Sequence, residues 1–251
     1  MSSTTEARVA VITGGSSGIG LHAARALRSR GLNVYELSRR AENAEPGVTH
    51  LQADVTDEAQ VDAAVAEVLR REGRIDILIN NAGFGLVSDF LSSDLGTELE
   101  MIETNAVAPH ILTKVFYRRF AEKGSGRILN VASSSAFMPA GPYFSSYYAT
   151  KSYLYTLTRS VAKEAREHGV RISVLCPGPI KTEFDGRAGV SKSLKGLDAR
   201  TVAKYAIGKF LKGKELIVPG ADIRLLKFAT RLLPDRASIF LTERQQKKKL
   251  R

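Results

Sequence analysis

The stretch Thr13-Gly14-Gly15-Ser16-Ser17-Gly18-Ile19-Gly20 directly follows a strand-like segment, residues 8–12, and opens a helix-like segment that continues to about Arg30. Its glycines permit a tight turn and a close approach of the backbone to a pyrophosphate. The start of the helix adds free N–H groups and the positive end of a dipole. A plain turn between a strand and a helix rarely needs three glycines. The stretch therefore indicates a dinucleotide site, to which we assign Gly14, Ser16, Ser17, Gly18, Ile19 and Gly20.

Strand-like and helix-like stretches alternate from this turn almost to the end of the chain. Further strands are predicted at residues 33–37, 48–51, 75–79, 127–131, 170–175 and 215–218. Helices are predicted at residues 57–71, 98–121 and 147–167. Repeated strand–helix–strand units predict an α/β fold with a single-domain, Rossmann-type, doubly wound parallel sheet and helices on both faces. We expect a catalytic domain over residues 1–223, with a substrate loop at about 182–200, and a basic C-terminal extension over residues 224–251.

Composition argues against a membrane-spanning, disulfide-linked or metal-binding protein. The longest apolar runs are strand-sized, well short of the roughly 18–20 residues of a spanning helix. The first residues lack the apolar segment of a secretory signal. Cys176 is the only cysteine, so no internal disulfide can form and a reducing compartment, the cytoplasm, is predicted. The four histidines show no metal-ligand spacing, and we predict no metal site.

The positive charge is concentrated at the C-terminus. The net charge is +11, and residues 224–251 hold nine Lys or Arg against two Asp or Glu. Such a tail suits an acidic partner: nucleic acid, an anionic membrane or another subunit. Phe228, Leu232 and Leu233 alternate with Lys227 and Arg231, so one face of this tail could be apolar and the other basic. A solvated, partly frayed end explains the same composition, and we favour it over a membrane or nucleic-acid contact.

The end of the second strand bears on the choice of cofactor. An acidic residue there would pair with the ribose hydroxyls of NAD. This chain has Ser38, followed by Arg39 and Arg40. Because arginine forks suit a 2′-phosphate, we predict NADP(H) in preference to NAD(H). A solvated loop is the alternative interpretation of the two arginines.

Two further strand ends are predicted to contact the adenosine side of the cofactor. Asp54 follows the third strand, where its carboxylate can accept a hydrogen bond from the adenine amino group, and Val55 lies beside it. Asn81, Ala82 and Gly83 follow the fourth strand, where small residues let the backbone pass close to the cofactor. The last three residues equally suit a turn that holds the sheet together.

Tyr147 and Lys151 are four residues apart on a predicted helix and therefore share one face. A cation within a few ångströms favours the phenolate, which makes the phenol a better proton donor and acceptor near neutral pH. Chance pairs with this spacing are common, but here a phosphate-binding signature lies upstream. Tyr148 is the competing phenol, three residues before Lys151.

Taken together, these motifs resemble the short-chain dehydrogenase/reductase family. The matching features occur in the family's order over residues 13–182: the glycine-rich turn, Asp54, Asn80-Asn81-Ala82-Gly83, Asn105, the serines at 133–135, Tyr147 with Lys151, and Pro177-Gly178 with Thr182. The resemblance implies that Tyr147 is the acid/base and that Lys151 lowers its pKa and holds the nicotinamide ribose. It implies that a serine orients the substrate oxygen and that Asn105 holds a water linking Lys151 to solvent.

The resemblance leaves the serine ambiguous. Counting forward from Asn130 favours Ser133, whereas counting back thirteen residues from Tyr147 favours Ser134. We choose Ser133 and keep Ser134 as the alternative. The turn after the sixth strand is expected to pack against the nicotinamide through Pro177, Gly178, Ile180 and Thr182. Cys176 beside it is interpreted as a small core residue because no base lies near it in the sequence to activate a thiol.

The predicted activity is an NADP(H)-dependent oxidoreductase that interconverts a carbonyl and an alcohol by hydride transfer. The expected pocket lining is apolar and suits a lipophilic ketone, aldehyde or sterol: Phe84, Phe137, Met138, Tyr143 and Phe184. Several of these could equally be core or dimer-contact residues. The alternative function is a regulator that senses NADP(H) without turnover. The family resemblance also implies a homodimer or homotetramer.

Overall fold

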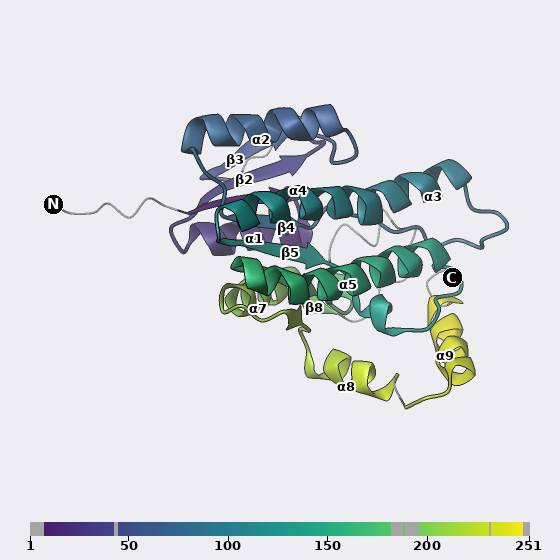
Figure 1. Ribbon diagram of the computed structural model, residues 1–251. Helices are drawn as coiled ribbons and strands as arrows, with labels where there is room; N and C mark the ends of the chain where they lie inside the picture. Colours follow the sequence, from purple (N-terminus) through teal and green to yellow (C-terminus); the bar gives the residue numbers. More distant parts are fainter. Residues whose placement is uncertain (1–7, 43–44, 182–187, 189–195, 231, 248–251) are drawn as a thin grey trace.

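The computed structural model describes residues 8–42, 45–181, 188, 196–230 and 232–247 (Figure 1). Within them a parallel seven-stranded sheet has the order β3-β2-β1-β4-β5-β6-β9. The strand bounds are β1 Val9–Thr13, β2 Asn33–Ser38, β3 Val48–Gln52, β4 Ile77–Asn80, β5 Gly126–Val131, β6 Val170–Leu175 and β9 Leu216–Ile217. A separate short pair joins β7 Ile180–Lys181 to β8 Leu197–Asp198.

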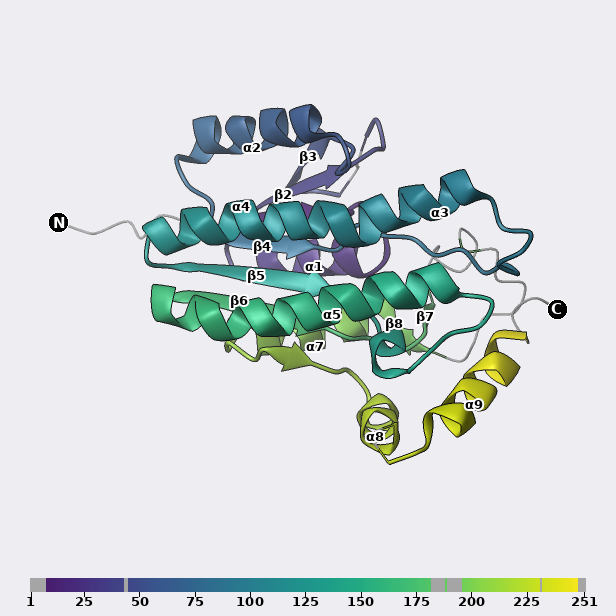
Figure 2. The ribbon, with the colours of Figure 1, turned by 45° about the vertical axis from the view of Figure 1, so that its right-hand side comes forward.

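Helices cover both faces of the sheet. Their bounds are α1 Gly18–Arg28, α2 Glu58–Glu72, α3 Leu95–Ile102, α4 Ala108–Glu122, α5 Ser145–Ala165, α7 Ala199–Leu211, α8 Ala221–Ala229 and α9 Asp235–Lys247. Figure 2 shows α2, α4 and α5 on one face and α1 and α7 on the other. Alternate residues of β1 supply the two cores: Val9 and Val11 face the first set of helices, and Ala10 and Ile12 the second. This architecture confirms the predicted doubly wound sheet.

The prediction of one helix over residues 98–121 was wrong. The chain forms α3 from Leu95, then one wide π turn over Glu103–Val107, then α4. The early start follows from Asp94, whose carboxylate caps the helix by accepting the N–H of Thr97 at 2.7 Å. Single π turns inside α-helices are frequent at functional sites. This one contains Asn105.

The C-terminus also differs from expectation. Residues 221–229 and 235–247 form α8 and α9, whereas composition favours a frayed end. α8 runs across the boundary predicted between residues 223 and 224. Figure 1 shows both helices on the side of the molecule opposite α2. Smaller differences concern the fourth strand, which starts at Ile77 rather than Ile75, and the last, which is limited to Leu216 and Ile217.

Candidate active site

A cavity of about 720 Å³ lies at the carboxyl ends of the central strands. In a doubly wound sheet this edge is where ligands bind, because loops from neighbouring strands diverge there. Figure 2 shows the arrowhead of β5 pointing to this side of the molecule. The wall combines the loops after β1, β2, β3, β4, β5 and β6 with side chains of α5, α8 and α9.

The glycine-rich turn forms a cradle that only glycine permits. Gly14 and Gly18 have φ values of 64° and 53°, in the left-handed region. A Cβ on Gly14 would lie 2.9 Å from the Cα of Ala82, and a Cβ on Gly20 only 2.3 Å from the Gly14 carbonyl oxygen. Ser17 precedes α1 without a side-chain hydrogen bond to the helix N–H groups. The turn therefore fits a pyrophosphate, which would meet these N–H groups at the helix start.

Five of the six residues assigned to this turn line the cavity: Gly14, Ser16, Ser17, Gly18 and Ile19. Gly20 lies beneath them and permits the close packing of α1 on the turn.

Asn81 lines the cavity and also holds the ends of two strands together. Its Nδ2 donates to the carbonyl oxygens of Thr13 at 3.1 Å and Gly14 at 2.9 Å. The hydroxyl of Thr13 accepts the N–H groups of Asn81 and Ala82 in return, so the ends of β1 and β4 are tied together.

The part of the cavity at the ends of β2 and β3 contains the residues predicted there from the sequence. Ser38, Arg39, Arg40, Asp54 and Val55 all line it. The Arg39 side chain is 61% exposed, and its guanidinium donates to Glu100 Oε1 at 2.8 Å and lies 3.8 Å from Asp54 Oδ2. Glu36, two residues before Ser38, is fully buried and contacts the His50 ring. Its carboxylate therefore lies below the turn rather than at the tip of β2.

Tyr147 and Lys151 both line the cavity from one face of α5. The Lys151 Nζ lies 5.7 Å from the centroid of the Tyr147 ring and donates to the Val131 carbonyl oxygen at 3.1 Å. Burial of the ammonium lowers the pKa of Lys151 to about 8. The ring of Phe144 is stacked on that of Tyr147 at 4.3 Å between centroids and 7° between planes. The Tyr147 ring thus has the Phe144 ring stacked on it and the Lys151 ammonium near it.

Asn105 is fully buried behind this pair. Its Nδ2 donates to the Phe84 carbonyl oxygen at 2.8 Å, and its Oδ1 accepts the Phe84 N–H at 3.0 Å. A Cβ on Gly83 would lie 2.7 Å from Asn105 Oδ1 and 3.3 Å from Lys151 Nζ. The absence of a side chain at Gly83 therefore lets Asn105 and Lys151 approach each other.

Ser133 and Ser134 both line the cavity. The Ser133 hydroxyl accepts the N–H of Ser135 at 3.1 Å. The N–H of Ser134 donates to the Pro177 carbonyl oxygen at 2.7 Å, which joins the ends of β5 and β6. Pro177, Gly178 and Ile180 line the same wall, while Thr182 lies outside the described residues.

The apolar wall differs in part from the one predicted. Phe84 and Met138 line the cavity, together with Phe144, Ile223 and Leu226. Phe137 does not, because its ring packs edge-on against Tyr155 and contacts the core around Cys176. Tyr143 contacts the Lys247 ammonium instead. Phe184 lies outside the described residues. Burial raises the pKa of the Cys176 thiol, as expected of a core residue.

Sequence reasoning missed a polar wall contributed by the C-terminal helix. Thr242, Gln245 and Gln246 of α9 line the cavity. Gln246 Nε2 donates to the Tyr148 hydroxyl at 2.7 Å across 98 residues of sequence. No local pattern predicts a contact of that separation. Also missed is a buried chain of hydrogen bonds beneath the site, from Asn80 through Asn130 to Thr158.

Two classes of feature are missing from the described part of the chain. It contains no cluster of three or more His, Cys, Asp or Glu side chains arranged to hold a metal ion. None of its helices is both long and apolar enough to cross a membrane.

The family model described as short chain dehydrogenase matches residues 8–191. The chain belongs to the short-chain dehydrogenase/reductase family. Oxidoreductase UcpA of Salmonella typhimurium is 34% identical over 184 residues, 70% of each chain. A putative ketoacyl reductase of Streptomyces coelicolor is 30% identical over 250 residues, covering 87% of this chain and 93% of the relative.

Solved structures agree with this membership. A short-chain dehydrogenase from Sphingobium yanoikuyae in complex with NADPH superimposes with a TM-score of 0.77 at 29% identity, covering 89% of this chain and 94% of that one. A 3-ketoacyl-(acyl-carrier-protein) reductase from Brucella melitensis complexed with NADH gives 0.76 at 25% identity, covering 86% and 98%. The protein is therefore an oxidoreductase, an NAD(P)-dependent dehydrogenase/reductase that acts on small molecules.

Proposed function

We propose that this protein is an NADP(H)-dependent carbonyl reductase or alcohol dehydrogenase in which Tyr147 is the acid/base. The observation that carries the proposal is the meeting of Tyr147, the buried Lys151 and the glycine cradle in one cavity. The bound cofactor supplies a hydride donor or acceptor. The glycine turn would hold its pyrophosphate, Asp54 and Val55 its adenine side, and Pro177, Gly178, Ile180 and Thr182 its nicotinamide side.

The preference for NADP(H) rests on Ser38, Arg39 and Arg40. They stand at the tip of β2 where a carboxylate would favour NAD(H). The 2′-phosphate would compete with Glu100 for the exposed Arg39 guanidinium, and a phosphate with two negative charges is the stronger partner. The neighbours named above include one complex with NADH and one with NADPH, so this choice depends on the arginines of this chain.

Side chains of this protein carry out the proton transfer that accompanies hydride transfer. Tyr147 donates its phenolic proton to the carbonyl oxygen during reduction and removes it during oxidation. The Lys151 ammonium stabilises the phenolate that remains. Ser133, or Ser134 in its place, donates a hydrogen bond that orients the substrate oxygen. Asn105 is a positioning residue in this scheme, because its buried amide holds the Phe84 backbone beside the pair.

The substrate proposed is a lipophilic ketone or aldehyde. Phe84, Met138, Phe144, Ile223 and Leu226 form an apolar wall that would favour such a molecule over a sugar. The hydroxyl of Tyr148 and the side-chain amides of Gln245 and Gln246 form a polar boundary on one side of the cavity. Turnover of polar sugars in preference to apolar ketones would contradict this choice.

The test compares neighbouring tyrosines in a steady-state assay with NADPH and a panel of ketones and aldehydes. Tyr147→Phe is expected to lower kcat by about 10²–10⁴-fold, the usual contribution of general acid–base catalysis. Tyr148→Phe removes a hydroxyl from the same cavity and is expected to keep most of the turnover. Full activity in Tyr147→Phe would refute the mechanism. Cofactor binding with no turnover in the wild-type protein would instead support an NADP(H) sensor.

Assembly into a homodimer or homotetramer is proposed from an exposed apolar stripe along α3 and α4. Its members are between 36% and 69% exposed: Leu95, Leu99, Ile102, Val107, Ile111 and Val115. Apolar area of this kind on one surface marks an interaction site.

We further propose a cytoplasmic location, which suits the free thiol of Cys176. Because α8 begins at Ala221, we place the boundary of the C-terminal extension at Gly220.

A further inference from the structure

Helix α9 is amphipathic in the opposite sense to an ordinary surface helix. Ser238, Thr242 and Gln246, spaced four residues apart, are its most buried side chains at 1–2% exposure. Phe240 and Leu241 are 62% and 53% exposed. A surface helix usually turns its apolar stripe to the core and its polar face to water. The apolar side chains Phe240 and Leu241 on the outer face of α9 are therefore not buried against the core of this chain.

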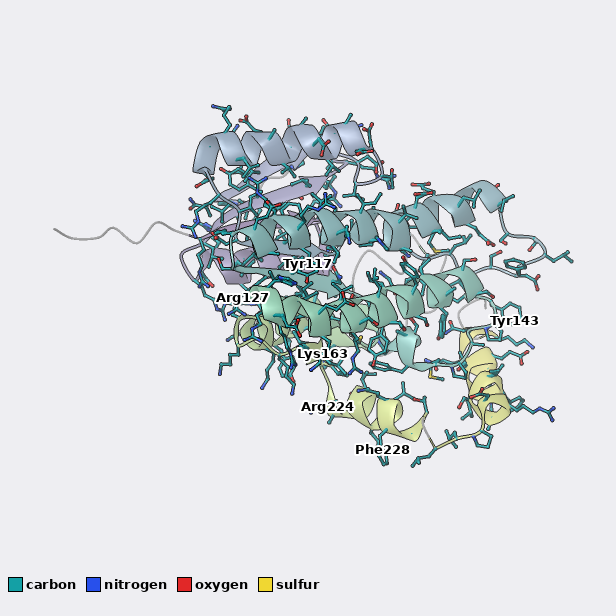
Figure 3. All side chains as sticks on the ribbon, viewed as in Figure 1. Tyr117, Arg127, Tyr143, Lys163, Arg224 and Phe228 are labelled. Atoms are coloured by element: carbon teal, nitrogen blue, oxygen red, sulfur yellow. The ribbon has the colours of Figure 1, made fainter. Side chains whose placement is uncertain are left out.

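Further exposed apolar side chains lie on α8 and in the turn between α8 and α9. Leu225, Phe228 and Leu232 are 67%, 61% and 71% exposed. Figure 3 shows Arg224 and Phe228 on α8 at the outer edge of the molecule. Together with Phe240 and Leu241, these five apolar side chains form what we term the α8–α9 surface. Exposed apolar residues gathered in one region mark an interaction site, whereas scattered single ones need no explanation.

Basic residues are interspersed with these apolar ones. Arg224, Arg236 and Arg244 are exposed on the same two helices. Over residues 224–251 the sequence carries nine Lys or Arg against two Asp or Glu. The partner must therefore offer both an apolar phase and negative charge.

We propose that the α8–α9 surface docks on an anionic lipid bilayer. Amphipathic helices with large apolar side chains and basic flanks lie in the interface of such a membrane, where both kinds of side chain find their partners. A second copy of the chain fits less well, because a two-fold contact through this surface would place one basic tail against the other. Nucleic acid offers the phosphates but no apolar phase for five exposed side chains.

The docking surface adjoins the cavity. Leu226 of α8 and Thr242 and Gln246 of α9 line the cavity from the same helices that carry the exposed apolar residues. Docking would thus bring the wall of the site to the membrane, where a lipophilic substrate is concentrated. This last point rests on the proposed function, whereas the docking itself does not.

The chain provides a matched control for the test. The dipeptide Phe-Leu occurs on α9 as Phe240-Leu241 and again as Phe90-Leu91, whose side chains are 69% and 96% exposed. Co-sedimentation with phosphatidylcholine vesicles, with and without phosphatidylserine, compares the full-length wild type with Phe240→Ser/Leu241→Ser and Phe90→Ser/Leu91→Ser. The first pair is expected to weaken binding to the phosphatidylserine vesicles by at least about tenfold, because two large apolar side chains no longer insert. The second pair is expected to bind like the wild type.

A charge variant makes the test independent of any effect on folding. Arg236→Gln/Arg244→Gln changes only exposed side chains and is expected to weaken binding to phosphatidylserine vesicles by about 25-fold, about fivefold for each cation. Added salt is expected to reduce the binding of the wild type.

Three results would overturn the proposal. The wild type could stay in the supernatant with both kinds of vesicle, or the two Phe-Leu variants could bind equally. The Phe240→Ser/Leu241→Ser variant could also change the oligomeric state without a change in vesicle binding, which would assign the surface to a second copy. None of these readouts requires turnover, so failure of the proposed enzyme activity is seen separately in the NADPH assay.

Discussion

Substitution of Gly83 by alanine tests the packing that brings Asn105 and Lys151 together. The new Cβ would lie 2.7 Å from Asn105 Oδ1 and 3.3 Å from Lys151 Nζ. An ordinary C···O contact is about 3.3 Å, so the amide must withdraw by roughly 0.6 Å. It has no room to do so freely, because Asn105 is fully buried and makes hydrogen bonds to both backbone groups of Phe84.

The expected cost follows from that geometry. Overpacking of a filled site costs about 1–3 kcal/mol, and a lost hydrogen bond adds about 1 kcal/mol. The unfolding entropy of a chain of 251 residues corresponds to about 2 °C per kcal/mol, so we expect the Tm to fall by about 4–8 °C. Displacement of Lys151 and the backbone beside it is expected to lower kcat by about 10–100-fold, since small misplacements of catalytic groups have effects of this size.

Thermal melts and NADPH consumption measure the two effects. The control is Gly208→Ala in α7, where a Cβ meets no atom within 4 Å. A glycine within a helix costs about 0.5–1 kcal/mol relative to alanine, so this variant is expected to be slightly more stable and fully active. Wild-type stability and turnover in Gly83→Ala would refute the reasoning. A lower Tm with unchanged kcat would separate the packing from the catalysis.

Three further predictions concern the charges and hydroxyls of the cavity. Arg39→Gln is expected to raise the KM for NADPH by about tenfold, which is the lower end of the loss expected for a charge-assisted hydrogen bond at an exposed site. The KM for NADH is expected to stay unchanged. Equal effects on both cofactors would contradict a contact between Arg39 and the 2′-phosphate. The pKa of Lys151 is about 8 in the folded protein and near 10.5 when unfolded, so above pH 8 the unfolded chain binds the extra proton and the stability of the cofactor-free protein rises with pH. Lys151→Met is expected to remove this rise, which denaturant melts between pH 8 and 9 measure. The Cys176 thiol, whose pKa is raised by burial, opposes the rise equally in both proteins, so the difference between the two curves reports Lys151. Parallel curves for both proteins would be the contrary result. Ser133→Ala is expected to lose more turnover than Ser134→Ala in the same NADPH assay, and full activity in both would remove the serine from the mechanism.

Local sequence was sufficient for much of the fold. The apolar segment at residues 9–12 and the glycines after it specify a strand, a left-handed turn and a helix start, all of which lie within a few residues of one another. The shared face of Tyr147 and Lys151 is likewise a local property, because four residues make about one helical turn. Once the sheet is parallel, the carboxyl ends of its strands must meet at one edge, so residues predicted just after strands could be assigned to a common site.

Contacts between distant segments were decided by the tertiary structure. The wide turn at Glu103–Val107 was not predicted, and it contains Asn105, whose amide donates to the Phe84 carbonyl oxygen 21 residues away in the sequence. The polar residues of α9 belong to the cavity wall only because Gln246 reaches Tyr148 across 98 residues. Composition suggested a frayed tail because a count of charged residues does not say which side chains of a helix face the protein and which face water. Whether a side chain faces the cavity or water depends on where its helix is packed, and that is set by the assembled sheet and not by the helix's own sequence.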